Sequence, residues 1–165
     1  MDLVIRDVRV IDGSGGASFR ADVAVDDGRI AAVVREGDGE RPTARRVLDA
    51  GGLALAPGFI DMHAHSDLAL LRDPAHEAKA AQGVTLEVIG QDGLSYAPVD
   101  DRTLAEVRAQ ITGWNGDGCD IDFSWRSVGE YLDRLDHGFG GEGIAVNAAY
   151  LIPQGTVRML ALGWG

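Results

Sequence analysis

The sequence has little cysteine, little lysine and no apolar run long enough to cross a bilayer. Cys119 is the one cysteine among 165 residues, so an intrachain disulfide is excluded, which suits a reducing cytoplasm. Lys79 is the one lysine, and the other basic residues are arginines. The N-terminus lacks a basic start followed by a long apolar segment. We therefore expect no signal peptide, no membrane span and a cytoplasmic location.

The charge balance disfavours polyanionic partners. The chain has 26 acidic and 15 basic side chains, giving a formal net charge of −11. A surface of this sign repels phosphate backbones and anionic lipids, so we expect neither nucleic acid nor membrane as a partner. Hydrophobic residues make up 45% of the chain, and glycine contributes 23 residues. This composition predicts a globular fold with many tight turns rather than a disordered chain.

The first 52 residues have the pattern of a small all-β unit. Residues 3–11 are rich in β-branched side chains with partial alternation, which predicts a strand. Further strands are predicted at residues 21–25, 29–34 and 47–49. The sequence Asp26-Asp27-Gly28 favours a tight turn between two of these strands. We therefore expect residues 1–52 to form a separate domain.

From residue 53 the pattern changes to alternating strands and helices. Residues 53–61 are mostly apolar on both faces, which is typical of a buried parallel strand. Asp73 as an N-cap, followed by Pro74, predicts a helix over residues 74–82. The remaining signals predict strands at 84–89 and 144–151. They also predict helices over 103–112, from Ser127 to Gly138, and from Thr156 to near Gly163. This β-α-β-α-α-β-α order predicts a parallel sheet with right-handed crossovers.

Two histidines follow the predicted strand 53–61. His63 and His65 are two residues apart, and side chains at i and i+2 of an extended segment point the same way. Two imidazoles that face one point can supply two nitrogen ligands to a divalent metal. Functional groups of barrel enzymes lie at this end of the strands. We therefore predict that His63 and His65 bind a metal; the alternative is a pair of exposed loop histidines.

Several carboxylates are further candidates for this site. Asp92 ends the next predicted strand and can bind a metal or a water, although a simple Asp-Gly turn explains it equally well. Asp61 and Asp67 lie close to the histidines in sequence, and either can orient a ligand imidazole. Glu87 lies mid-strand, where a buried carboxylate needs a partner. We interpret the three tryptophans as packing residues.

The motif around the histidines resembles the first barrel strand of the amidohydrolase superfamily. It reads Pro57-Gly58-Phe59-Ile60-Asp61-Met62-His63-Ala64-His65. The preceding β unit is similar to the β-sandwich that flanks the barrel in hydantoinase-type members. Residues 81–85, 90–98 and 147–158 resemble the D-aminoacylase (N-acyl-D-amino-acid deacylase) branch. The resemblance covers nearly the whole chain.

The resemblance implies an α/β fold with two domains. Residues 1–52 would be a β-sandwich segment, and residues 53–165 would contribute the first three strands of a metal-dependent (β/α)8 TIM-type barrel, which is incomplete in this chain. It also implies one or two divalent metal ions, with zinc as the expected metal. The family's later histidine ligands and catalytic aspartate would come from strands beyond Gly165, so no catalytic residue is assigned.

The chain departs from the branch at two positions. The branch usually carries Asn-Cys-Gly, with a metal-binding cysteine, where this chain has Gln91-Asp92-Gly93. An oxygen ligand is harder than a thiolate, so we expect a different metal preference. Many members also have a histidine where Gln154 stands. Both changes leave the acyl group and side chain of the substrate open.

By resemblance, the complete enzyme would hydrolyse the amide bond of an N-acyl-D-amino acid. A second interpretation is a hydantoinase- or dihydroorotase-like enzyme that acts on cyclic amides. A third is a non-catalytic role for a truncated or degenerate relative. Three barrel strands leave open sheet edges, which favour pairing with another chain, either as a homo-oligomer or with a complementing C-terminal chain. We expect the 165 residues alone to be inactive.

Overall fold

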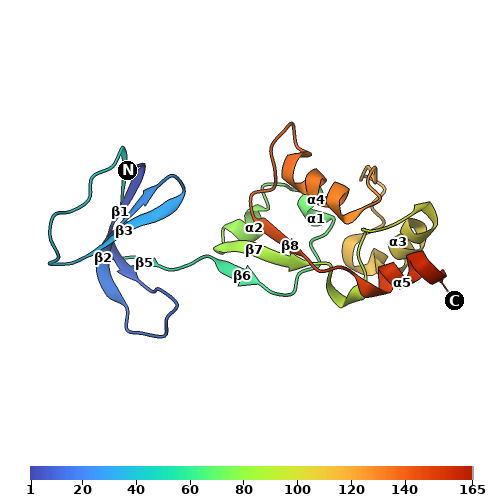
Figure 1. The fold of residues 1–165 in the computed structure, drawn as a ribbon, viewed down its shortest axis with the longest axis horizontal. Coiled ribbons are helices and arrows are strands. Elements are labelled where there is room, and N and C mark those ends of the chain that lie inside the picture. Colours follow the sequence, from blue (N-terminus) through green and yellow to red (C-terminus); the bar gives the residue numbers. More distant parts are fainter. Residues whose placement is uncertain (165) are drawn as a thin grey trace. The chain divides into compact units, whose positions relative to one another are not determined.

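Two sheets organise the part of the protein that the structure describes, residues 1–164 of a computed structural model. The chain divides into a first unit, Met1–Pro57, and a second unit that begins at Gly58. Each unit has its own sheet and its own buried apolar cluster (Figure 1). Within residues 1–164, no helix is long and apolar enough to cross a membrane.

The first unit contains one mixed sheet. Its strands are β1 (Leu3–Val10), β2 (Phe19–Asp26), β3 (Arg29–Arg35), β4 (Arg46–Asp49) and β5 (Ala54–Leu55). The order is β3-β2-β1-β4, and β5 also pairs with β1. Strand β1 is antiparallel to β2 but parallel to β4 and β5. Alternate side chains of a strand share a face, and Val8, Val10, Ala21 and Val23 form the buried cluster of this sheet.

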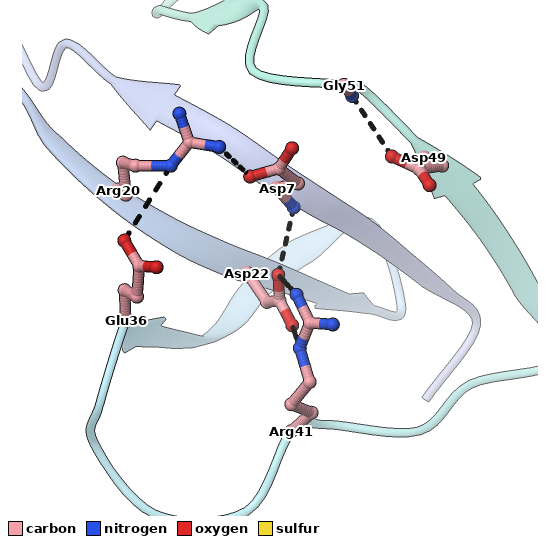
Figure 2. Close-up of polar contacts among 7 residues, drawn as sticks. All are labelled: Asp7, Arg20, Asp22, Glu36, Arg41, Asp49 and Gly51. Atoms are coloured by element: carbon pink, nitrogen blue, oxygen red, sulfur yellow. Dashed lines mark hydrogen bonds and ion pairs between the residues drawn. The ribbon is translucent and has the colours of Figure 1, made fainter.

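A polar network ties the loop after β3 to this sheet (Figure 2). Asp22 is 4% exposed, and its carboxylate accepts hydrogen bonds from Arg41 Nε at 2.7 Å and from the Asp7 backbone N–H at 2.9 Å. Burial raises the pKa of Asp22, but these hydrogen bonds outweigh it and leave the pKa below its ordinary value. Arg20 pairs with both Asp7 and Glu36. These charges therefore have structural partners within the first unit.

Between residues 58 and 164, the second unit contains a parallel sheet and five helices. Its strands, in sheet order, are β6 (Phe59–Asp61), β7 (Val84–Ile89) and β8 (Asn147–Tyr150). Its helices are α1 (Ala69–Arg72), α2 (Glu77–Ala80), α3 (Asp101–Asn115), α4 (Val128–His137) and α5 (Gln154–Leu162), with a 3-10 turn, η1, at Gln91–Gly93. Both strand pairs are parallel, which confirms the predicted parallel sheet. Helices α3 and α5 lie side by side (Figure 1).

The core of the second unit draws its side chains from the sheet and the longer helices. Ile89 of β7, Val107 of α3 and Tyr131 of α4 are all buried in one cluster. Trp125 packs against Tyr131 with ring centroids 5.3 Å apart, and it is 2% exposed. The interpretation of a tryptophan as a packing residue is therefore confirmed for Trp125.

Local capping signals predict one helix start and miss another. Helix α4 begins with the expected capping box, in which Ser127 Oγ accepts the Glu130 N–H at 3.2 Å and Glu130 Oε2 accepts the Ser127 N–H at 2.8 Å. The helix expected over 74–82 is wrong at its start. Helix α2 begins at Glu77, and His76 before it is left-handed, with φ 45°. The reason is a contact with another element, since His76 Nε2 lies 3.3 Å from a Glu87 oxygen on β7.

The single buried strand expected over 53–61 is also wrong. The segment divides into β5 and β6, because Leu53 and Leu55 pair with β1 through their carbonyls and Pro57, which has no N–H, follows. In β6, Phe59 and Ile60 are 64% and 56% exposed. This exposure follows from the sheet order, since β6 has β7 alone as its neighbour in the described part of the chain.

Candidate metal centre

The segment that carries the two histidines, residues 62–65, is tied to the end of β7. The Ala64 N–H donates to the Val88 carbonyl at 3.1 Å. The buried Gln91 donates its Nε2 hydrogens to the Met62 carbonyl at 2.9 Å and to the Val88 carbonyl at 2.8 Å. Because β6 and β7 are parallel, the residues after both strands lie at the same edge of the sheet. These hydrogen bonds fix the histidine segment there.

The turn after β7 brings Asp92 to the same edge. Gly90 has φ 76°, and a Cβ at this position would lie 2.3 Å from the Leu151 carbonyl oxygen, so the turn requires glycine. Asp92 itself has φ 55°, a left-handed conformation that aspartate and asparagine tolerate better than most side chains. The structure therefore brings together the three predicted ligands, His63, His65 and Asp92.

The spacing of the three donor atoms fits one metal ion. His63 Nε2 lies 3.3 Å from His65 Nε2, and Asp92 Oδ2 lies 3.5 Å from the first nitrogen and 3.2 Å from the second. Ligand bonds of about 2.0–2.2 Å at tetrahedral angles separate donor atoms by about 3.3–3.6 Å. The side chains of His63 and Asp92 are 58% and 48% exposed, so the cluster has an open side. Two imidazoles and a carboxylate form a donor set that zinc and similar divalent ions accept.

The carboxylates of Asp61 and Asp67 accept hydrogen bonds from different groups. Asp61 Oδ1 accepts the His63 backbone N–H at 3.1 Å, so Asp61 acts on that histidine through its backbone. Asp67 is buried, and its carboxylate accepts a hydrogen bond from Ser95 Oγ. Burial raises the pKa of Asp67. In the described chain, the hydrogen bonds of these two carboxylates go to backbone, lysine and serine groups rather than to imidazole rings.

Comparison with known proteins identifies the family. A family model described as "Amidohydrolase family" matches residues 46–165, well over half of the chain. The chain belongs to the amidohydrolase family.

Amidohydrolases of the D-aminoacylase branch are prominent among its relatives. The chain is 50% identical over 98 residues to N-acyl-D-glutamate deacylase of Alcaligenes xylosoxydans xylosoxydans, a match covering 59% of this chain and 20% of the relative. It is 36% identical over 157 residues to D-aminoacylase of the same organism, covering 95% of this chain and 30% of the relative. The predicted resemblance to this branch is confirmed.

A solved structure supports the same assignment. The N-acyl-D-glutamate deacylase of Bordetella bronchiseptica, crystallised with zinc and a phosphonate inhibitor, superposes with a TM-score of 0.75 at 33% identity. The match covers 98% of this chain and 31% of the deacylase. The mixed α/β fold of this chain is thus similar to that of a deacylase whose crystal structure contains zinc. The chain spans about a third or less of the length of these relatives.

Two side chains at the amidohydrolase site were not anticipated from the sequence. Gln91 lies next to Asp92 in sequence, but nothing in the sequence indicates that its amide reaches the Met62 carbonyl. Trp114, at the end of α3, lies against His65 with ring centroids 4.5 Å apart, and it is 52% exposed. The interpretation of this tryptophan as a packing residue is therefore incomplete, because one face of it borders the candidate metal centre.

The position of Trp114 predicts a fluorescence response to metal. Open-shell ions quench a nearby indole, so addition of Co²⁺ is expected to lower tryptophan emission saturably, with a stoichiometry that matches the bound metal. Trp114→Phe should lose this response, whereas Trp164→Phe, which removes another exposed indole, should keep it. The measurement is a Co²⁺ titration followed by emission. Equal saturable quenching in Trp114→Phe and the parent protein would contradict the placement of the metal beside His65.

Proposed function

We propose that the protein is a metal-dependent hydrolase of an amide bond, and that its substrates are N-acyl-D-amino acids. The observation that carries this proposal is the cluster of His63, His65 and Asp92, whose donor atoms lie 3.2 to 3.5 Å apart at the carboxyl ends of parallel strands. The names of the relatives suggest the substrate class, since one is an N-acyl-D-glutamate deacylase and another a D-aminoacylase. The zinc in the Bordetella bronchiseptica enzyme supports a divalent metal here.

The proposed architecture follows from the same relatives. We propose that residues 1–57 form part of a β-sandwich and that the chain from residue 58 begins a (β/α)8 barrel. This boundary lies after the one expected at residue 52, because β5 pairs with β1 in the first sheet. Three parallel strands in chain order, joined by helices, support this arrangement. An eight-stranded barrel needs five more strands, which this proposal assigns to sequence beyond residue 165. The groups that move protons in catalysis are expected there too, so residues 1–165 expressed alone should show no turnover.

The residues of this chain have distinct tasks in the proposed reaction. His63, His65 and Asp92 would hold the ion, and a divalent metal at this point supplies Lewis acidity and a nucleophile at neutral pH. Asp61 fixes the His63 backbone, and Gln91 holds the histidine segment against β7. Trp114 lies against the His65 ring and would form part of the wall of the site.

Substrate profiling of the protein expressed from its complete coding sequence tests this proposal. We expect release of free amine from N-acetyl-D-amino acids, with kcat/KM for the D-enantiomer exceeding that for the L-enantiomer by about tenfold or more, which corresponds to 1.4 kcal/mol. Hydantoin and dihydroorotate serve as cyclic amide controls. Faster hydrolysis of the cyclic amides, or no hydrolysis of any amide by the metal-loaded protein, would contradict the proposal.

A further inference from the structure

A fully buried carboxylate lies on β7, the strand that leads to Asp92 of the candidate metal centre. Glu87, in the middle of β7, is 0% exposed. Lys79 Nζ lies 2.8 Å from its Oε1, and His76 Nε2 lies 3.3 Å from its Oε2. Burial raises the pKa of Glu87, but contacts with Lys79, Ser66 and His76 outweigh it and leave the pKa below its ordinary value. A charge removed from water in this way requires a counter-charge, and Lys79 provides it.

Lys79 links this buried carboxylate to the histidine segment. Its ammonium group also contacts Asp61 Oδ2, and the other oxygen of Asp61 accepts the His63 backbone N–H. Asp61 on β6 and Glu87 on β7 are directly paired positions in the sheet. A continuous path therefore runs from Glu87 through Lys79 and Asp61 to the backbone of His63.

The arrangement places one cation between two acidic side chains on neighbouring strands. Lys79 lies on α2, a helix of four residues packed against β7, and its side chain is partly buried. Without this cation, the Asp61 carboxylate would lose the ammonium group that holds its Oδ2, whatever the charge of Glu87. Asp61 is the more exposed of the two, and it would turn toward solvent and release the His63 N–H. The histidine segment would then lose one of its fixed contacts.

We propose that Lys79 is a positioning residue of the metal centre, which holds Asp61 on the His63 backbone and thereby raises the metal affinity of the His63, His65 and Asp92 cluster. The inference rests on the proposed metal-binding function and adds to it a residue outside the donor set. Loss of a group that hydrogen-bonds to a metal ligand and orients it typically lowers metal affinity by about 10- to 100-fold. Lys79 acts indirectly, because it contacts Asp61, and Asp61 in turn contacts the histidine segment.

The test compares metal affinities of variants in the protein expressed from its complete coding sequence. Zn²⁺ and Co²⁺ dissociation constants are measured by chelator competition, and thermal unfolding of the metal-free proteins is followed by circular dichroism. We expect Lys79→Met to bind metal about 10- to 100-fold more weakly, and Lys79→Arg, which keeps the charge, to recover most of the affinity. Arg158→Met removes one positive charge from an exposed position on α5 and should bind metal as the parent does.

Two double variants separate positioning from a purely structural ion pair. In Lys79→Met/Glu87→Gln the unpaired buried charge is gone, so stability should recover while metal affinity stays low. In Lys79→Met/Asp61→Asn the losses should not add, because both changes break the same path. Parent-like affinity in folded Lys79→Met, recovery of affinity in the first double variant, or additive losses in the second would overturn the role of Lys79. Absence of metal binding by the parent protein would instead overturn the proposed function itself.

Discussion

Replacing His63 and His65 together with alanine is expected to abolish stoichiometric metal binding and to lower kcat/KM roughly a thousandfold or more. The double change removes two of the three proposed donors. The remaining donor, the Asp92 carboxylate, is 48% exposed and offers the ion a single ligand group. The loss in rate follows because metal-ion catalysis contributes several kcal/mol to transition-state stabilisation. Metal content after dialysis and initial rates measure the two effects.

The control for this experiment is another exposed histidine. His137 lies at the end of α4 and is not part of the donor cluster, so His137→Ala should retain the metal content and rate of the parent protein. The thermal stability of the metal-free double variant should change little, because His63 is exposed and His65 is only partly buried. Full metal stoichiometry in the folded double variant would contradict the assignment of these histidines as metal ligands.

The elements that local signals specify were predictable from the sequence. The capping box of Ser127 and Glu130 lies within four residues, so the start of α4 is encoded where it occurs. Asp100 likewise caps α3 by accepting the Thr103 N–H at 2.6 Å, although the predicted helix began later. The start of α2 could not be found in this way. His76 adopts its left-handed conformation beside Glu87, which lies on another element and carries no local signal.

The candidate site likewise has features that the sequence predicts and features that depend on tertiary packing. His63 and His65 could be paired from their spacing, and Asp92 could be placed beside them because parallel strands end at one edge. The supporting contacts depend on tertiary packing. Lys79 reaches Asp61 from a short helix that the sequence places only approximately, and Trp114 reaches His65 from the end of α3. Such contacts join residues that are distant in sequence, so periodicity and spacing do not contain them.

The second large effect is expected at Asp92, whose removal should weaken metal binding about a hundredfold. The comparison uses Asp92→Asn, because asparagine also tolerates the φ of 55° at this position but carries no charge. An alanine here adds a backbone cost of about 1–2 kcal/mol, so a stability difference between the two variants reports on the turn rather than on the metal. Chelator competition with Zn²⁺ gives the affinities. If Asp92→Asn binds as tightly as the parent, the carboxylate charge does not contribute to the site.

Substitution of Asp92 by cysteine tests the same assignment through metal preference. A thiolate is softer than a carboxylate, so Asp92→Cys should favour Zn²⁺ over Mn²⁺ by about tenfold or more relative to the parent, or 1.4 kcal/mol. The variant should also show thiolate-to-metal charge transfer when Co²⁺ is bound. Asp92→Ala has the same unfavourable φ but offers no ligand atom. The difference in metal affinity between Asp92→Cys and Asp92→Ala therefore measures the contribution of the sulfur. An unchanged Zn²⁺ to Mn²⁺ ratio and no charge-transfer band would place residue 92 outside the coordination sphere and leave the two histidines as the ligands from this chain.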